Sequence, residues 1–335
     1  MINYCMPAIL VKNLSKTYGR VTAIDGLSFQ IKKGQIAGFL GPNGAGKSTA
    51  MRILCGLIPA TSGSAHIDGI SVAKYPNLVK RQIGYMPEQN LLPEDMRVIE
   101  YLRYRALIKE LPRPNIRPAV DEAMEVCDLN RKARRRIIGT LSKGFRQRVG
   151  IADAILANPQ IIFMDEPTIG LDPHQIIGIR RLIDSLRGRM TLLLSSHILS
   201  EIELCCDCII IINQGKIVAQ GSSEELRQEF TADTRFRIRF RGSIVKFKEI
   251  LARIEATAKI IPNSASDTQG YTEIDIDTPN RIRVAEELII ALTKENHFKI
   301  SELTHHNSNL EEVFLAATRR SWDEVATPLK PKDHT

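Results

Sequence analysis

The sequence predicts an α/β protein: a largely parallel β-sheet with helices on its faces, followed by a small α+β domain with a ferredoxin-like order of elements. Short apolar runs alternate with helical stretches over the first 230 residues, and a Gly-rich loop follows one of these runs. After Phe230 the pattern changes to strands that alternate between apolar and charged residues. We therefore expect one domain at 1–230, a second at 231–320 and a disordered tail at 321–335.

Composition and charge narrow the possible classes of protein. The chain has 335 residues, of which 43% are hydrophobic and 25% charged, as in ordinary globular proteins and unlike disordered or disulfide-stapled chains. No apolar run approaches the roughly 18 residues needed to cross a bilayer, and the start MINYCMPAIL lacks the pattern of a secretory signal, so we expect a cytoplasmic location. The net charge of +8 favours anionic partners, whether nucleotides, nucleic acid or acidic lipid.

Three continuous apolar runs predict the central strands of the first domain. They lie at 36–40, 161–164 and 192–194, and each ends at polar residues or at glycine. Continuous apolarity without alternation is typical of strands covered on both faces. Ligands of such sheets bind outside the carboxyl ends of the strands, so we look for the functional residues there.

The remaining elements follow in order along the chain. A run at 208–212, a turn at 213–215 and a strand at 216–221 predict a hairpin, and Ser222 begins a short helix. In the second domain the order is β-α-β-β-α-β. Its elements are expected at 235–240, 244–256, 258–262, 271–277, 280–295 and 298–303, and a last amphipathic helix at 308–318.

A phosphate-binding loop is predicted directly after the first apolar run. The segment from Gly41 to Ser48 fits the pattern GxxxxGK[ST] and opens an amphipathic helix. Glycines let the backbone wrap closely, so that N–H groups and the helix N-terminus point at phosphate oxygens. Lys47 supplies a cation near the β- and γ-phosphates, and Ser48 a hydroxyl ligand for Mg²⁺.

The second apolar run ends in two adjacent carboxylates, Asp165 and Glu166. At the end of a strand beside the phosphate-binding loop, Asp165 can reach the shell of the metal. Glu166 can then take a proton from an attacking water, a role worth roughly 10²–10⁴ in rate. An acidic helix cap is the alternative interpretation, and the nearby phosphate-binding loop favours the catalytic one.

With these motifs, the chain resembles the nucleotide-binding subunit of an ATP-binding-cassette (ABC) transporter, over about residues 1–228. Five further segments match that family in order: KTYG with Tyr18, GYMPEQN with Gln89, the signature at 141–145, the D-loop at 170–173 and the LLLSSH strand ending in His197. The resemblance implies an ABC ATPase of the P-loop NTPase class, with a RecA-like core, an antiparallel β subdomain and a helical subdomain that carries the signature. LEEVFLAATRR near the C-terminus is similar to exporter ATPases of the drug-resistance type.

The resemblance also implies the roles of individual residues. Tyr18 would stack on adenine, Gln89 would reach the metal and the attacking water, and His197 would sense the γ-phosphate. The implied catalytic residues are Glu166, His197 and Gln89, and the implied metal ligands are Ser48, Gln89 and Asp165. The implied ATP contacts are Tyr18, Gly41, Pro42, Asn43, Gly44, Ala45, Gly46, Lys47, Ser48, Thr49, Ser142, Gly144 and Asp172.

The signature segment departs from the family's LSGGQ. Lys143 replaces a glycine and Phe145 replaces the glutamine, whereas Ser142 and Gly144 retain the hydroxyl and the backbone N–H at a helix N-terminus. We hypothesise that Lys143 lies near the nucleotide of a partner subunit.

By resemblance, each Mg-ATP lies between the phosphate-binding loop of one subunit and the signature of another. This chain has one of each, so a second copy or a homologous ATPase subunit is implied, together with a separate integral-membrane permease that it joins at the cytoplasmic face of the cell membrane.

Two alternatives remain open: a soluble ABC ATPase acting on nucleic acid or ribosomes, and a nucleotide sensor without hydrolysis. No nucleic acid partner is expected, because the chain lacks a second cassette, zinc modules and coiled coils.

Other polar features have ordinary explanations. The basic run at 131–136 and the arginine face at 235–241 are interpreted as solvated surface, with contact to lipid, a partner or nucleic acid as the alternatives. Cys205 and Cys208 form a CxxC without the second pair that a zinc site requires. His305 and His306 are expected in an exposed loop rather than in a metal site.

Overall fold

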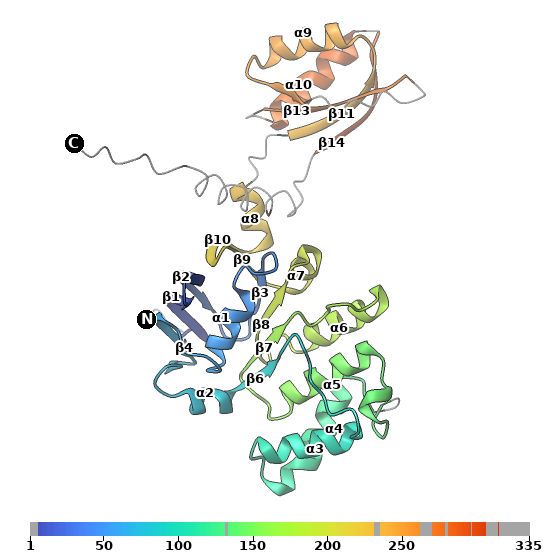
Figure 1. The fold of residues 1–335 in the computed structure, drawn as a ribbon. Coiled ribbons are helices and arrows are strands. Elements are labelled where there is room, and N and C mark those ends of the chain that lie inside the picture. Colours follow the sequence, from blue (N-terminus) through green and yellow to red (C-terminus); the bar gives the residue numbers. More distant parts are fainter. Residues whose placement is uncertain are drawn as a thin grey trace, which may run out of the picture. The chain divides into compact units, whose positions relative to one another are not determined.

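The computed structural model describes residues 6–130, 133–230, 235–261, 270–278, 281–295, 297–305 and 314. The described residues divide into two compact units, one that ends at residue 223 and one that begins at residue 224 (Figure 1). Within the described ranges, no helix combines the length and the apolar character that crossing a membrane requires.

A six-stranded sheet forms the centre of the first unit, in the order β10-β9-β3-β8-β7-β6. All neighbouring strands are parallel except the edge strand β10, which runs antiparallel to β9. The predicted central runs are β3 (Ile36–Leu40), β7 (Ile161–Asp165) and β8 (Thr191–Ser196), and every residue in them is buried. The others are β6 (Ile83–Met86), β9 (Cys208–Asn213) and β10 (Lys216–Gly221). Burial on both faces explains why these strands are continuously apolar.

A second sheet is antiparallel and has the order β2-β1-β4-β5. It packs against helix α1 (Lys47–Leu54) and shares one hydrophobic core with this helix and the central sheet. Its strands are β1 (Ile9–Tyr18), β2 (Val21–Ile31), β4 (Ser62–Ile67) and β5 (Ile70–Ser71). Phe29 of β2 meets Phe39 of β3 edge to face, with ring centroids 5.2 Å apart, so the two sheets share one core. This core fixes the start of α1 at the carboxyl end of β3.

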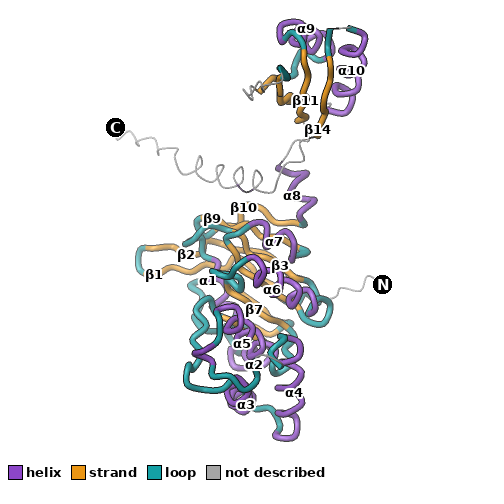
Figure 2. Tube along the Cα trace, turned by 90° about the vertical axis from the view of Figure 1, so that its right-hand side faces the viewer, coloured by secondary structure: helices purple, strands orange, loops and turns teal. Residues whose placement is uncertain are grey.

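Three helices, α3 (Val98–Ile108), α4 (Arg113–Val126) and α5 (Lys143–Ile155), pack together in the first unit (Figures 1 and 2), and α5 contacts β6. The buried Asp153 joins α5 to α3, because its carboxylate accepts hydrogen bonds from Tyr101 at 3.2 Å and Arg105 at 3.0 Å and lies 3.6 Å from the ammonium of Lys109. The remaining helices of this unit are α2 (Pro76–Gln82), the 3-10 turn η1 (Ile138–Thr140), α6 (Pro173–Ser185) and α7 (Leu199–Cys205).

The predicted hairpin is confirmed as β9 and β10. Asn213 belongs to the first strand, so the loop has only two residues, Gln214 and Gly215, with φ of 48° and 79°. Two central residues with positive φ match the twist of the flanking strands, and glycine adopts this conformation at no steric cost.

The second unit contains β11 (Arg235–Arg241), α9 (Ile244–Ile254), β12 (Lys259–Ile261), β13 (Thr272–Asp277), α10 (Arg281–Lys294) and β14 (Lys299–His305). The sheet order β12-β13-β11-β14, antiparallel throughout, confirms the predicted ferredoxin-like arrangement. Phe236, Ile238 and Phe240 are fully buried against the helices, as their alternation predicts. Helix α8 (Ser223–Phe230) precedes these elements. The helix predicted at 308–318 lies outside the described residues, apart from residue 314.

Candidate active site

The Gly-rich loop lies between β3 and α1, at the carboxyl end of the central sheet. Two of its glycines are required by close contacts: a Cβ on Gly41 would lie 2.2 Å from the carbonyl oxygen of Ile212, and one on Gly46 would lie 2.6 Å from that of Ala23. Gly46 also has φ of 106°, a conformation that favours glycine. The turn of the hairpin supports the loop, because Gly215 donates its N–H to the carbonyl of Ala45 at 3.0 Å.

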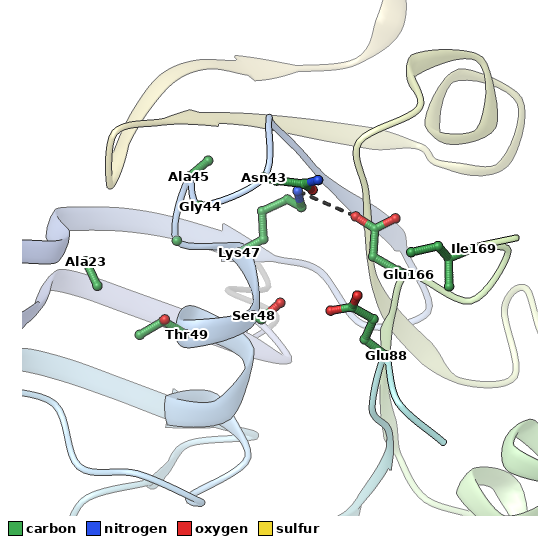
Figure 3. Close-up of a pocket in the computed structure, with 11 residues that line it drawn as sticks. Ala23, Asn43, Gly44, Ala45, Lys47, Ser48, Thr49, Glu88, Glu166 and Ile169 are labelled. Atoms are coloured by element: carbon green, nitrogen blue, oxygen red, sulfur yellow. Dashed lines mark ion pairs between the residues drawn. The ribbon is translucent and has the colours of Figure 1, made fainter. Parts of the chain in front are cut away.

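A pocket of about 390 Å³ opens over this loop (Figure 3). The predicted ATP contacts from Asn43 to Thr49 all line it, and Glu166 faces Lys47 from the opposite wall. The full lining is Ala23, Asn43, Gly44, Ala45, Gly46, Lys47, Ser48, Thr49, Glu88, Glu166 and Ile169. Backbone N–H groups at the start of a helix make such a pocket suited to an anion with several phosphates.

Asp165 is brought to Ser48 by the order of the strands. Its side chain is buried, and Oδ1 accepts hydrogen bonds from the hydroxyl of Ser48 at 3.1 Å and from that of Ser195 at 2.5 Å. Ser195 is the register partner of Asp165 on the neighbouring strand β8. The negative charge of Asp165 also acts on Tyr85. Burial is the larger cause that raises the pKa of Tyr85 to about 12, and the charge of Asp165 is the second cause.

Glu166 lies between two cationic or hydrogen-bonding side chains. One carboxylate oxygen is 3.5 Å from the ammonium of Lys47, and the other is 2.9 Å from Nδ1 of His197. Glu166 has φ of 50°, which is unusual for a residue with a side chain. Its N–H is held by the hydroxyl of Ser195 at 2.9 Å and by the carbonyl of the same residue at 3.2 Å. Backbone strain of this kind costs about 1–3 kcal/mol and recurs at functional sites.

Several predicted site residues do not line the pocket, among them Gly41 and Pro42 at the start of the loop, Tyr18 and Gln89. Tyr18 ends β1 with its ring half exposed and with the ammonium of Lys16 over it at 4.9 Å. Gln89 lies in the bend after β6, where its side chain is exposed. The preceding residue, Glu88, lines the pocket instead and points toward Ser48 (Figure 3). The roles of Tyr18 and Gln89 stay predictions.

The signature and D-loop residues also lie outside the pocket of their own chain. Ser142 is exposed and caps α5 by accepting a bond from the N–H of Phe145 at 3.4 Å, and Asp172 caps α6 by accepting one from Gln175 at 2.9 Å. Gly144 is buried. Lys143 lies against the D-loop of the same chain: a Cβ on Gly170 would be 2.3 Å from its ammonium nitrogen. The hypothesis that Lys143 lies near a partner's nucleotide therefore competes with this contact inside the chain.

Comparisons with known proteins decide the family. The family model described as "ABC transporter" matches residues 24–169. The bacitracin transport ATP-binding protein BcrA of Bacillus licheniformis is 37% identical over 92% of this chain and 96% of its own length. The chain belongs to the ABC transporter family.

Two further comparisons extend this result. The linearmycin resistance ATP-binding protein LnrL of Bacillus subtilis is 32% identical to this ABC ATPase over 92% of the chain and 98% of its own. A solved dimeric ATP-binding cassette in a post-hydrolysis state, bound to ADP and phosphate, shares 26% identity with a TM-score of 0.59 and covers 64% of this chain and 98% of its own. The chain is an ATP-binding and ATP-hydrolysing subunit of the ABC transporter family, and these relatives do not support an action on nucleic acid or ribosomes.

The sequence reasoning missed three parts of this ABC ATPase site. Ser195 was interpreted only as part of an apolar strand. A serine at the end of a buried strand, paired with Asp165 on the neighbouring strand, indicates a hydrogen bond to that carboxylate. Glu88 had no signal that distinguished it from Gln89. Nothing in the sequence indicates the contacts of Glu201 either, which lies on α7 and is 6% exposed.

The basic segments have partners within the chain. In the run at 131–136, of which 131 and 132 lie outside the described residues, Arg134 pairs with Asp121 at 2.6 Å and Arg136 donates to the carbonyl of Thr140 at 2.8 Å. In the second unit, Arg237 makes two bonds to Asp275 across the sheet, at 2.7 and 3.0 Å. These contacts favour a structural role for both segments over a binding surface.

Proposed function

We propose that this ABC ATPase works as a dimer, with a second copy or a homologous subunit, and drives a separate integral-membrane permease from the cytoplasmic face of the membrane. Each ATP would lie between the loop at 41–49 of one subunit and Ser142 of the other. The relatives named above for bacitracin transport and linearmycin resistance support an export role. A likeness to dimeric cassettes supports the assembly.

One observation supports the shared site most directly. The pocket over the phosphate-binding loop is lined by that loop, Glu88 and Glu166, and no signature residue of the same chain reaches it. Ser142 is meanwhile exposed at the start of the 13-residue helix α5. A helix N-terminus and the hydroxyl proton of Ser142 are donors for a phosphate, so the two half-sites complement each other.

The oxygen donors at the pocket fit Mg²⁺. The hydroxyl of Ser48 and the carboxylate of Asp165 lie 3.1 Å apart at the end of β7, and hard oxygen donors are what Mg²⁺ prefers in nucleotide sites. Ser48 and Asp165 would hold the ion, directly or through water. When bound, Mg²⁺ supplies positive charge that offsets the charge on the phosphates.

The side chains around Glu166 give the hydrolysis step its geometry. Lys47 and the backbone N–H groups of the loop hold the phosphates. Glu166 accepts a proton from the water that attacks the γ-phosphorus as the bond to the leaving ADP oxygen breaks, which gives ADP and phosphate. His197 holds the second oxygen of Glu166 at 2.9 Å and so fixes the orientation of the carboxylate.

The first prediction concerns the metal and compares Glu88 with Gln89. Both residues are exposed, but only Glu88 lines the pocket, so we expect Glu88→Gln to raise the Mg²⁺ concentration for half-maximal ATP binding several-fold, whereas Gln89→Ala changes it little. Mn²⁺ can replace Mg²⁺, and its electron paramagnetic resonance spectrum gives the affinity without hydrolysis. A larger effect of Gln89→Ala would restore Gln89 as the residue that reaches the metal.

The assembly is tested with the Glu166→Gln variant, in which hydrolysis is slowed and a closed dimer accumulates. We expect light scattering to show dimers with Mg-ATP and monomers without it, and Ser142→Arg, which places a bulky cation at the proposed seam, to abolish the dimer. Glu122→Gln, on the exposed side of α4, is the control. Monomers of Glu166→Gln in saturating Mg-ATP would refute the proposed assembly.

The permease and the location are tested by purification from native membranes. We expect the full chain to recover an integral-membrane protein whose presence stimulates ATP hydrolysis. The relevant comparison is with salt-washed membranes, because a basic chain also binds anionic surfaces nonspecifically and such binding weakens with salt. Recovery of nucleic acid or ribosomes instead of a membrane protein would contradict the transport role.

A further inference from the structure

Glu201 is a buried carboxylate close to the active site. It lies on α7, four residues after His197, and is 6% exposed. Its Oε2 accepts a short hydrogen bond from the hydroxyl of Thr168 and a second from the hydroxyl of Ser196 at 3.1 Å. Its other oxygen, Oε1, is buried and has no hydrogen-bond partner among the described residues.

The two hydroxyls belong to the two segments that carry the reacting side chains. Thr168 lies two residues after Glu166, in a turn closed by a hydrogen bond from the N–H of Ile169 to the carbonyl of Glu166 at 3.2 Å. Ser196 immediately precedes His197, and its oxygen also accepts the N–H of Ile198 at 3.0 Å. Glu201 therefore connects the backbone on both sides of the contact between Glu166 and His197.

The backbone of Glu166 needs such support. This residue holds φ of 50° and is followed by Pro167, and residues before proline normally prefer extended backbone. Strained conformations persist where the surroundings determine them from several directions. The hydroxyl of Ser195 accepts the N–H of Glu166 and so fixes the backbone before this residue. Thr168, whose hydroxyl donates to Glu201, fixes the turn that follows Glu166.

The free-energy cost of burying the Glu201 carboxylate also indicates that it has a function. A buried carboxylate with one oxygen lacking a partner loses hydration that its two hydrogen bonds only partly replace. An apolar side chain would fill the same space between α7 and β8 without this loss. A carboxylate, in contrast, can accept two hydroxyl protons at one oxygen and join two segments.

We infer that Glu201 is a positioning residue for ATP hydrolysis, which holds the turn after Glu166 and the segment before His197 in one fixed relation. It acts through Thr168 and Ser196 and does not itself touch the nucleotide. The inference rests on the role proposed above for Glu166.

The test separates positioning from simple stability by comparing Glu201→Ala with Glu201→Gln. Glutamine keeps an oxygen that accepts both hydroxyl protons, and alanine keeps none. We expect Glu201→Ala to lower kcat by roughly 10- to 100-fold, since misplacing reacting groups by about 1 Å costs on this order. ATP affinity should stay within about twofold of the wild type, because the phosphate-binding loop makes no bond to Glu201, and Glu201→Gln should recover most of kcat. Single-turnover hydrolysis and binding of a fluorescent ATP analogue give the two quantities.

Two hydroxyl variants keep the inference testable if Glu201→Ala folds poorly. Thr168→Val removes one bond to Glu201, whereas Ser196→Ala removes a bond to Glu201 and also the bond that its oxygen accepts from the N–H of Ile198. Each should lower kcat with ATP affinity retained. Combining Thr168→Val with Glu201→Ala should add little further loss, because both act through one contact. Glu203→Ala, on the same helix, is the matched control and should leave kcat unchanged.

Three results would overturn the inference: an unchanged kcat in Glu201→Ala, equal losses of kcat and ATP affinity in all variants, or no recovery in a folded Glu201→Gln. A failure of the proposed function looks different. In that case Glu166→Gln itself would hydrolyse ATP at the wild-type rate, whatever the Glu201 variants do.

Discussion

Glu166→Gln is expected to lower the rate of ATP hydrolysis by roughly 10²–10⁴-fold, the range that a positioned general base contributes. Glutamine keeps the shape of the side chain and its contact with His197, but an amide cannot accept a proton from water at neutral pH. ATP binding should persist, because the loop at 43–49 that holds the phosphates is unchanged. Phosphate release and equilibrium binding of ATP measure the two effects separately.

The geometry around Glu166 makes this variant informative. Its carboxylate is 3.5 Å from the ammonium of Lys47, so the neutral amide removes one ion pair from a buried site. A modest change in melting temperature can accompany the substitution and does not affect the argument as long as ATP still binds. Glu122→Gln, whose carboxylate pairs with Arg189 on the surface, controls for the loss of a charge. Equal rates of phosphate release in Glu166→Gln and the wild type would remove Glu166 as the base.

The central sheet and its motifs could be predicted because burial leaves a plain pattern. Runs such as 161–164 are apolar at every position, and only a strand covered on both faces requires this. Once these strands are parallel neighbours, the loop after β3, the carboxylates after β7 and His197 after β8 must meet at one edge. In the second unit, strict alternation at 235–240 predicted β11 in the same way, and the succession of strand and helix patterns after it predicted the ferredoxin-like order.

The remaining site residues could not be predicted because their positions depend on loop conformation. Glu88 and Gln89 are adjacent in a bend without periodicity, and nothing in the sequence indicates which of them lines the pocket. Glu201 occupies a position in an amphipathic helix where an exposed carboxylate is ordinary. Its burial arises from the packing of α7 on β8 and on the turn after Glu166, which are distant in the sequence.

Lys47→Met is expected to weaken ATP binding by roughly 30- to 150-fold, which corresponds to about 2–3 kcal/mol, the worth of a hydrogen bond to a charged group. Methionine retains most of the apolar stem, which is nearly fully buried at 5% exposure, so the loss falls on the ammonium group. That group now donates to the carbonyl of Gly41 at 2.7 Å and lies 3.5 Å from Glu166. It can therefore turn to phosphate oxygens within the same pocket without moving α1. Isothermal titration with a non-hydrolysable ATP analogue measures the affinity.

The loss of ATP affinity expected in Lys47→Met must be distinguished from a loss of folding stability. Removing the ammonium leaves the carboxylate of Glu166, itself 5% exposed, with His197 as its remaining side-chain partner among the described residues, and an uncompensated buried charge is destabilising. The double variant Lys47→Met with Glu166→Gln removes both charges and should recover melting temperature but not ATP affinity. Lys80→Ala, an exposed position on α2, is the control for a lost surface cation. If the double variant instead binds ATP as tightly as the wild type, Lys47 serves the protein's stability and not the phosphates.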